Sequence, residues 1–120
     1  METTELMQDD IVSHNGKPVY VKAILDYDEV MVAEEIDSDK WEKVYAIELE
    51  PVELTEQWLL RFGFRKIKGN RYAIPSALWH GTVKSMPGFW LFYGREAVIY
   101  LPSVHILQHV LIDCKYRKKI

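Results

Sequence analysis

Three pairs of turn-forming residues constrain this chain most, because each pair separates two short runs that read as β-strands. Asn15-Gly16 is the clearest, since both residues accept the positive φ that a tight hairpin turn requires. Gly69-Asn70 and Gly94-Arg95 separate two further pairs of runs in the same way. The three signals predict antiparallel sheets built from hairpins.

The N-terminal part of the chain reads as four or five short strands between Asp10 and Leu54. Alternation of Val19 and Val21 with Tyr20 and Lys22 gives the period of a strand that has one face on a core. So small an antiparallel sheet would leave exposed edges unless it curled on itself. We therefore expect a small SH3-like β-barrel over residues 1–54.

The remaining residues, 55–120, read as a short helix, several strands and a longer helix. Thr55 can cap the first helix and Gly63 can close it in the left-handed conformation. Pro102-Ser103 opens the final helix, which is expected to continue to about Lys115. The predicted fold class is α+β, with the barrel packed on this C-terminal unit to form one compact body.

Charge divides the 120-residue chain into an acidic and a basic half. Residues 1–57 contain 16 Asp and Glu against 4 Lys and Arg, whereas residues 58–120 contain 2 against 11, so charges of −12 and +9 sum to −3. A basic half attracts phosphate, an acidic partner or the acidic half of its own chain. The acidic first ten residues do not resemble a secretory signal, no run reaches the ~20 apolar residues that span a membrane, and there is one cysteine, so we expect a cytoplasmic protein without membrane contact.

A nucleic-acid-binding surface is one candidate function, because basic and aromatic residues interleave in the second half. Cations neutralise phosphates, and exposed aromatic rings stack on bases. The alternative is that the aromatic residues are core and the charges are their solvated neighbours. The candidate residues are Arg61, Arg65, Lys66, Lys68, Arg71 and Tyr72.

An acidic protein-interaction surface is the other candidate, and we expect a protein partner rather than a nucleic acid. The leading interpretation is a non-enzymatic module that binds a macromolecule, and pairing of acidic and basic halves in a homodimer is a further possibility. The candidate residues of this surface are Asp26, Asp28, Glu34, Glu35, Asp37 and Asp39.

Catalytic and metal-binding motifs are weak throughout the sequence. His105, His109 and Asp113 recur every four residues of the final helix, so they can reach one metal ion, but they also fit the solvated face of an amphipathic helix. Cys114 lies near the carboxyl end of that helix, where a thiol is poorly activated, and is expected to be a packing residue. We expect no cofactor and no enzymatic activity, and a metal-dependent enzyme is the distant alternative.

Three segments carry a resemblance to a known family: Asp10 to Gly16, Pro51 to Phe64 and Val104 to Gln108. On these residues the chain resembles small uncharacterised proteins abundant in Bacteroidetes genomes and in the phages and mobile elements of those bacteria. The resemblance implies a bacterial or phage origin in the cytosol and supplies no activity. This chain departs from the family at its end, where Cys114 to Ile120 is unusually basic.

Overall fold

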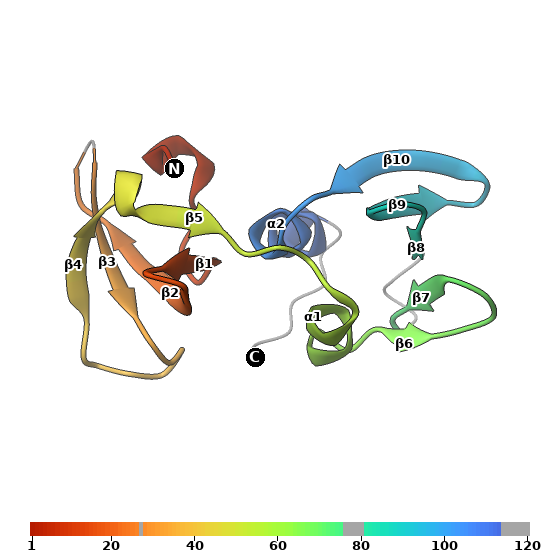
Figure 1. Cartoon of the computed structure of the whole chain (residues 1–120), viewed down its shortest axis with the longest axis horizontal. Coiled ribbons are helices and arrows are strands. Elements are labelled where there is room, and N and C mark those ends of the chain that lie inside the picture. Colours follow the sequence, from red (N-terminus) through yellow and green to blue (C-terminus); the bar gives the residue numbers. More distant parts are fainter. Residues whose placement is uncertain (27, 76–80, 114–120) are drawn as a thin grey trace. The chain divides into compact units, whose positions relative to one another are not determined.

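The chain divides into two compact units, Met1–Val52 and Glu53–Ile120 (Figure 1). This division lies two residues before the boundary expected at 54/55. The computed structural model describes residues 1–26, 28–75 and 81–113. Two antiparallel sheets and two α-helices are present in these residues, so the predicted α+β class is confirmed.

The first unit is a five-stranded antiparallel sheet with two short 3-10 helices. Its strands follow the order β4-β3-β2-β1-β5. The elements are η1 (Thr3–Glu5), β1 (Ile11–His14), β2 (Lys17–Ile24), β3 (Glu29–Ala33), β4 (Glu42–Tyr45), η2 (Ala46–Glu48) and β5 (Leu49–Pro51).

The predicted Asn-Gly hairpin joins β1 to β2. Asn15 and Gly16 have φ values of 53° and 80°, which are the positive angles that a two-residue hairpin turn requires. The turn fixes the register of the two strands, and Val12 lies opposite Val19. Valines of neighbouring strands thereby share one face of the sheet and form an apolar cluster. The buried members are Leu6, Val12, Val19, Val21, Val30, Val32, Val44, Ala46 and Leu49.

The expected SH3-like barrel is not confirmed, because the sheet does not close. Among the described residues, β4 pairs only with β3 and β5 pairs only with β1, so both are edges of the sheet. The expectation rested on the cost of unprotected edges, but these edges carry their own protection. Charged residues and proline discourage pairing with another strand, and Glu42 and Lys43 lie on one edge while Glu50 and Pro51 lie on the other.

The second unit begins with the predicted short helix, α1 (Glu56–Arg61). The Thr55 hydroxyl accepts a hydrogen bond from the backbone N–H of Trp58, as expected of a cap. At the other end, Phe64 N–H donates to the Leu59 carbonyl and Gly63 N–H donates to the Leu60 carbonyl. This pair of hydrogen bonds is a Schellman motif, and the helix therefore ends where the sequence predicted.

A second five-stranded sheet follows, in the order β10-β9-β8-β7-β6 (Figure 1). The hairpins around Gly69-Asn70 and Gly94-Arg95 are confirmed, whereas the strand Thr82–Ser85 was not predicted. The elements are β6 (Arg65–Lys66), β7 (Arg71–Ala73), β8 (Thr82–Ser85), β9 (Phe89–Tyr93), β10 (Glu96–Leu101) and the final helix α2 (Val104–Asp113).

Apolar side chains from both helices and from one face of the sheet are buried in the second unit. Register places Tyr72 opposite Val83 and Val83 opposite Leu91, and all three are buried. Leu59 of α1 and Leu107 of α2 are fully buried as well. Because side chains alternate along a strand, the residues on either side of each of these three in its own strand point to the opposite face of the sheet.

Candidate nucleic-acid interface

The opposite face of the second sheet carries a row of basic and aromatic residues that crosses four strands. Arg71 lies opposite Lys84, Lys84 opposite Trp90, and Trp90 opposite Tyr100. None of these four side chains is buried. We call this surface the open face, and its residues are Arg65, Arg71, Thr82, Lys84, Trp90, Phe92 and Tyr100.

The aromatic members of the open face contact one another. The ring centroids of Trp90 and Tyr100 lie 5.0 Å apart with an angle of 41° between the ring planes. Tyr100 also covers Gly88, where an added Cβ would lie 2.8 Å from a carbon of the tyrosine ring. Only glycine leaves room for this approach, so the Tyr100 ring packs over the backbone at Gly88 as well as against Trp90.

A pocket of about 210 Å³ lies at one end of the open face. Three cationic side chains line it, and no carboxylate does. The Nζ atom of Lys84 lies 5.9 Å from the centroid of the Phe92 ring, so the pocket combines positive charge with an apolar wall. Its lining residues are Arg71, Thr82, Lys84, Phe92, Gly94 and Arg95.

Only two of the six nucleic-acid-binding residues predicted from the sequence, Arg65 and Arg71, belong to the open face. Lys66 pairs with Tyr72 and therefore lies on the other side of β6, and Lys68 lies in the turn that follows. Arg61 is on α1, with its guanidinium 4.3 Å from the centroid of the Trp58 ring.

Tyr72, predicted as a nucleic-acid-binding residue, is only 4% exposed, so its ring is not available to stack on a base in this structure. Tyr72 belongs to the buried face of the sheet. Burial raises the pKa of its phenol, and the nearby charge of Glu56 and a hydrogen bond to that carboxylate raise it further.

Sequence reasoning missed Trp90, Phe92 and Tyr100 as site residues. Alternation within Phe89–Tyr93 was a usable signal, since it separates Trp90 and Phe92 from the buried Leu91. The row itself becomes visible only through the register of four strands, which no local pattern specifies.

The six predicted acidic residues do not form one surface in the first unit. Asp26 and Asp28 precede β3, whereas Glu34, Glu35, Asp37 and Asp39 follow it in the loop that leads to β4. A five-residue strand separates the two groups by about 17 Å. The acidic surface therefore reduces to the loop between β3 and β4, which we call the acidic loop.

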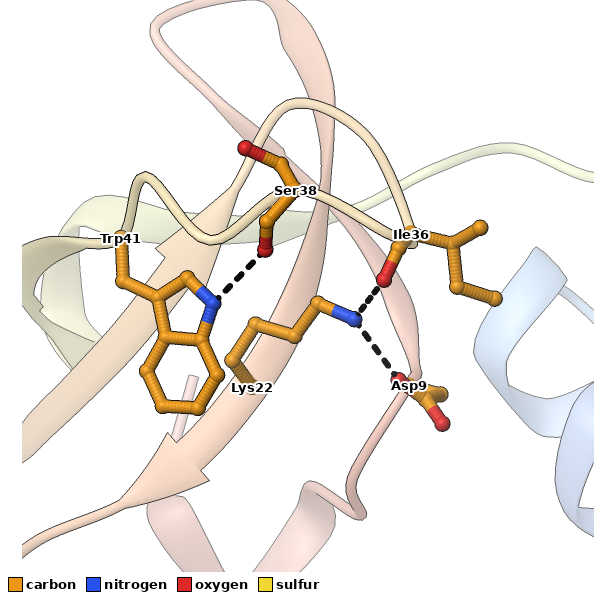
Figure 2. Close-up of polar contacts among 5 residues, drawn as sticks. All are labelled: Asp9, Lys22, Ile36, Ser38 and Trp41. Atoms are coloured by element: carbon orange, nitrogen blue, oxygen red, sulfur yellow. Dashed lines mark hydrogen bonds and ion pairs between the residues drawn. The ribbon is translucent and has the colours of Figure 1, made fainter.

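A buried lysine anchors the acidic loop (Figure 2). The side chain of Lys22 is 8% exposed, and its Nζ atom donates to the Ile36 carbonyl and lies 3.2 Å from Asp9 Oδ1. On the outer side, Trp41 Nε1 donates to the Ser38 carbonyl at 2.9 Å. These bonds hold the backbone of the loop beside the sheet.

A cleft of about 710 Å³ borders the acidic loop, and its charges are mixed. Lys17 and Lys40 line it together with the carboxylates, and Lys17 lies 3.9 Å from Glu34. The cleft therefore presents partly neutralised charge to solvent.

His105 of α2 does not lie on a solvated face, whereas His109 is half-buried. His105 is 5% exposed, its Nδ1 atom lies 2.9 Å from Ser103 Oγ, and its ring is 5.6 Å from that of His109. The solvated-face interpretation is wrong for His105. The Asp113 side chain and Cys114 lie outside the described residues. Within the described part of the chain, no group of three or more His, Cys, Asp and Glu residues is placed to hold a metal ion.

Comparisons with known proteins leave the open face as the main indication of function. No protein family, no curated protein and no solved structure matches this chain. Among the described residues, no helix has the length and apolar character needed to cross a membrane.

Proposed function

We propose that this protein is a non-enzymatic binding protein whose second unit binds single-stranded nucleic acid through the open face. The observation that carries the proposal is the cross-strand row Arg71, Lys84, Trp90 and Tyr100. The row brings cations and accessible aromatic rings onto one flat surface. Sheets with this combination suit single strands, because the bases stack on the rings while the cations neutralise phosphates.

Electrostatics supports an anionic ligand on this face. Arg65, Arg71, Lys84 and Arg95 form no ion pair with any residue in the ranges 1–26, 28–75 and 81–113. Their charges are therefore not neutralised by neighbouring carboxylates. Phosphate groups of a bound strand would neutralise them and release counterions.

Accessible rings favour a single strand over a duplex. Stacking needs the flat face of a base, which a duplex keeps inside its own stack. Tyr100 is 46% exposed and lies against Trp90, so the two rings offer a platform that an unpaired base can cover. We expect single strands to bind at least about tenfold more tightly than a duplex of equal length.

Fluorescence anisotropy with labelled oligonucleotides about 12 nucleotides long tests the proposal, since small sheet domains cover strands of this size. Trp90→Ala removes one stacking surface, which contributes about 1–3 kcal/mol, so affinity should fall at least about fivefold. Trp41→Ala is the matched control, because it makes the same change in the first unit and should leave affinity unchanged.

A salt titration tests the electrostatic part. For an unphosphorylated strand, contacts of Arg65, Arg71 and Lys84 with three phosphates predict a slope of about −2 for log affinity against log salt. Affinity should then fall about 20-fold between about 50 and 200 mM salt. Absence of binding at the lower salt concentration, or equal affinity of the wild type and Trp90→Ala, overturns the proposal.

Three further expectations stay predictions. They are contact of the acidic loop with a basic protein partner, pairing of the two halves in a homodimer, and a bacterial or phage origin. The mixed charges of the cleft, where Lys17 and Lys40 lie among the carboxylates, favour the open face as the principal binding surface.

A further inference from the structure

We infer that the pocket at the end of the open face binds a terminal phosphate of the strand, a phosphomonoester at one of its ends. This inference rests on the proposed function and assigns a role to the pocket lined by Arg71, Thr82, Lys84, Phe92 and Arg95. Position, charge and size each support it.

The pocket lies where the sheet ends. Thr82 is the first residue of β8, and Gly94 and Arg95 form the turn between β9 and β10. Arg95 therefore flanks the pocket from a turn beyond the last residue of β9. A nucleic-acid strand that lies along the aromatic row and enters this pocket reaches the margin of the sheet. This position suits the end of the nucleic-acid strand.

Three cations converge on this small volume. They come from three different elements, namely Arg71 from β7, Lys84 from β8 and Arg95 from the β9–β10 turn. A phosphodiester inside a strand carries one negative charge, whereas a terminal phosphomonoester carries about 1.5 to 2 near pH 7. The more highly charged group neutralises more of the mutual repulsion among the three cations, and it should be the preferred ligand.

The donors also match a phosphate that has three free oxygens. Each guanidinium offers two parallel N–H groups to one anion, and a lysine adds a point charge. The Thr82 hydroxyl supplies a further donor on the same wall. A diester has only two free oxygens, so a monoester makes fuller use of this set.

Size restricts the occupant to part of a ligand. Pockets for whole small molecules usually measure about 300–1,000 Å³, and this pocket of about 210 Å³ is smaller. A phosphate and part of its nucleoside fit, with the Phe92 ring as the apolar wall, while the rest of the strand remains on the open face.

The aromatic row favours a nucleic acid over a phosphopeptide. Phe92 belongs to the pocket, and Trp90 is two residues away on the same face of β9. Flat rings next to a phosphate site suit a ligand that carries a flat base beside its phosphate. A phosphopeptide gains little from such a surface.

The test compares one labelled single strand in three forms: unphosphorylated, with a 5′-phosphate, and with a 3′-phosphate. We expect one phosphorylated form to bind about tenfold more tightly than the unphosphorylated form, because hydrogen bonds to a charged group are strong. Arg95→Gln should abolish that preference and change the affinity for the unphosphorylated strand less than about threefold. Arg95 is exposed in a turn, so the variant should fold.

Arg61→Gln is the matched control, since it removes an identical charge from α1 and should preserve the preference. Equal affinity for all three forms overturns the pocket inference and leaves the proposed function standing. Failure of every form to bind overturns the proposed function itself. A free nucleoside monophosphate or a phosphoserine peptide that competes as well as the phosphorylated strand also contradicts the inference, because the occupant is then not a strand end.

Discussion

Both sheets have five antiparallel strands, but the cations of the two sheets differ in their neighbours. In the first unit, Lys17, Lys22 and Lys43 each lie within 4.0 Å of a carboxylate oxygen. In the second, the cations of the open face form no ion pair with a described residue, and Lys84 lies beside the Phe92 ring. Charges of the first kind are neutralised within the unit, and the buried Lys22 supports the fold, whereas charges of the second kind remain available to a ligand.

Exposed aromatic residues also differ between the two units. In the second unit Trp90 is half-buried and lies against Tyr100, which is 46% exposed. The pair leaves apolar surface in contact with water, and such surface lowers solubility and adds little to the stability of the fold. In the first unit Trp41 is also exposed, but its indole N–H bonds to the Ser38 carbonyl and holds the acidic loop (Figure 2). An exposed ring with a structural hydrogen bond needs no ligand to explain it.

Replacing Lys22 with Met should have the largest effect and tests whether the paired cations support the fold. The change leaves the Ile36 carbonyl without this donor and removes the cation beside Asp9. Breaking a buried pair costs about 3–5 kcal/mol, and because the Asp9 side chain is 31% exposed we expect about 2–3 kcal/mol of lost unfolding free energy. Urea denaturation followed by circular dichroism measures this loss.

Lys43→Met is the control for Lys22→Met. Lys43 lies 3.8 Å from Glu29, but its side chain is 54% exposed, and exposed pairs contribute at most about 1 kcal/mol. Equal stability of the two variants would contradict the role given to the buried lysine.

Gly88→Ala should have an intermediate effect and tests whether the open face is preorganised. Gly88 has a φ of 80°, and its new Cβ would displace the Tyr100 ring. We expect a loss of about 1–2 kcal/mol in stability from the positive φ, together with weaker binding of single strands because the ring pair is disturbed.

Gly16→Ala separates those two consequences. Gly16 also has a φ of 80°, but nothing lies within 4 Å of the added Cβ. This variant should lose a similar amount of stability and retain full affinity for oligonucleotides. Anisotropy on both variants provides the comparison, and equal affinities would show that the position of Tyr100 does not matter for binding.

Local signals in the sequence were sufficient for the hairpins and the first helix. Asn15-Gly16 and Thr55 act through their own backbone neighbours, so the sequence patterns contain the whole cause. The strand Thr82–Ser85 was missed because four residues with one buried side chain carry little periodic signal.

Properties that depend on distant strands were beyond the reach of those patterns. Tyr72 is buried because β7 pairs with β8, and the row from Arg71 to Tyr100 joins residues from four strands. The expected barrel was not confirmed and the expected solvated position of His105 was wrong for the same reason, since both depend on which elements meet in three dimensions.

Tyr72 provides the smallest expected effect and tests whether the buried face of the second sheet is separate from the open face. Its pKa is raised above 10.0, mainly by burial and also by Glu56. Below pH 10 the phenol is neutral in both the folded and the unfolded state, so its contribution to stability is complete. Above pH 10 the unfolded chain ionises first, and stability should fall until the pH passes the folded-state pKa.

Urea midpoints at pH about 8 and about 11 measure this fall. In Tyr72→Phe the fall should be smaller than in the wild type, whereas Tyr45→Phe, which replaces an exposed phenol in the first unit, should keep the wild-type fall. Tyr72→Phe should also bind single strands as tightly as the wild type at neutral pH, since the side chain lies on the buried face. A loss of affinity in that variant would mean that the two faces of the sheet are not functionally separate.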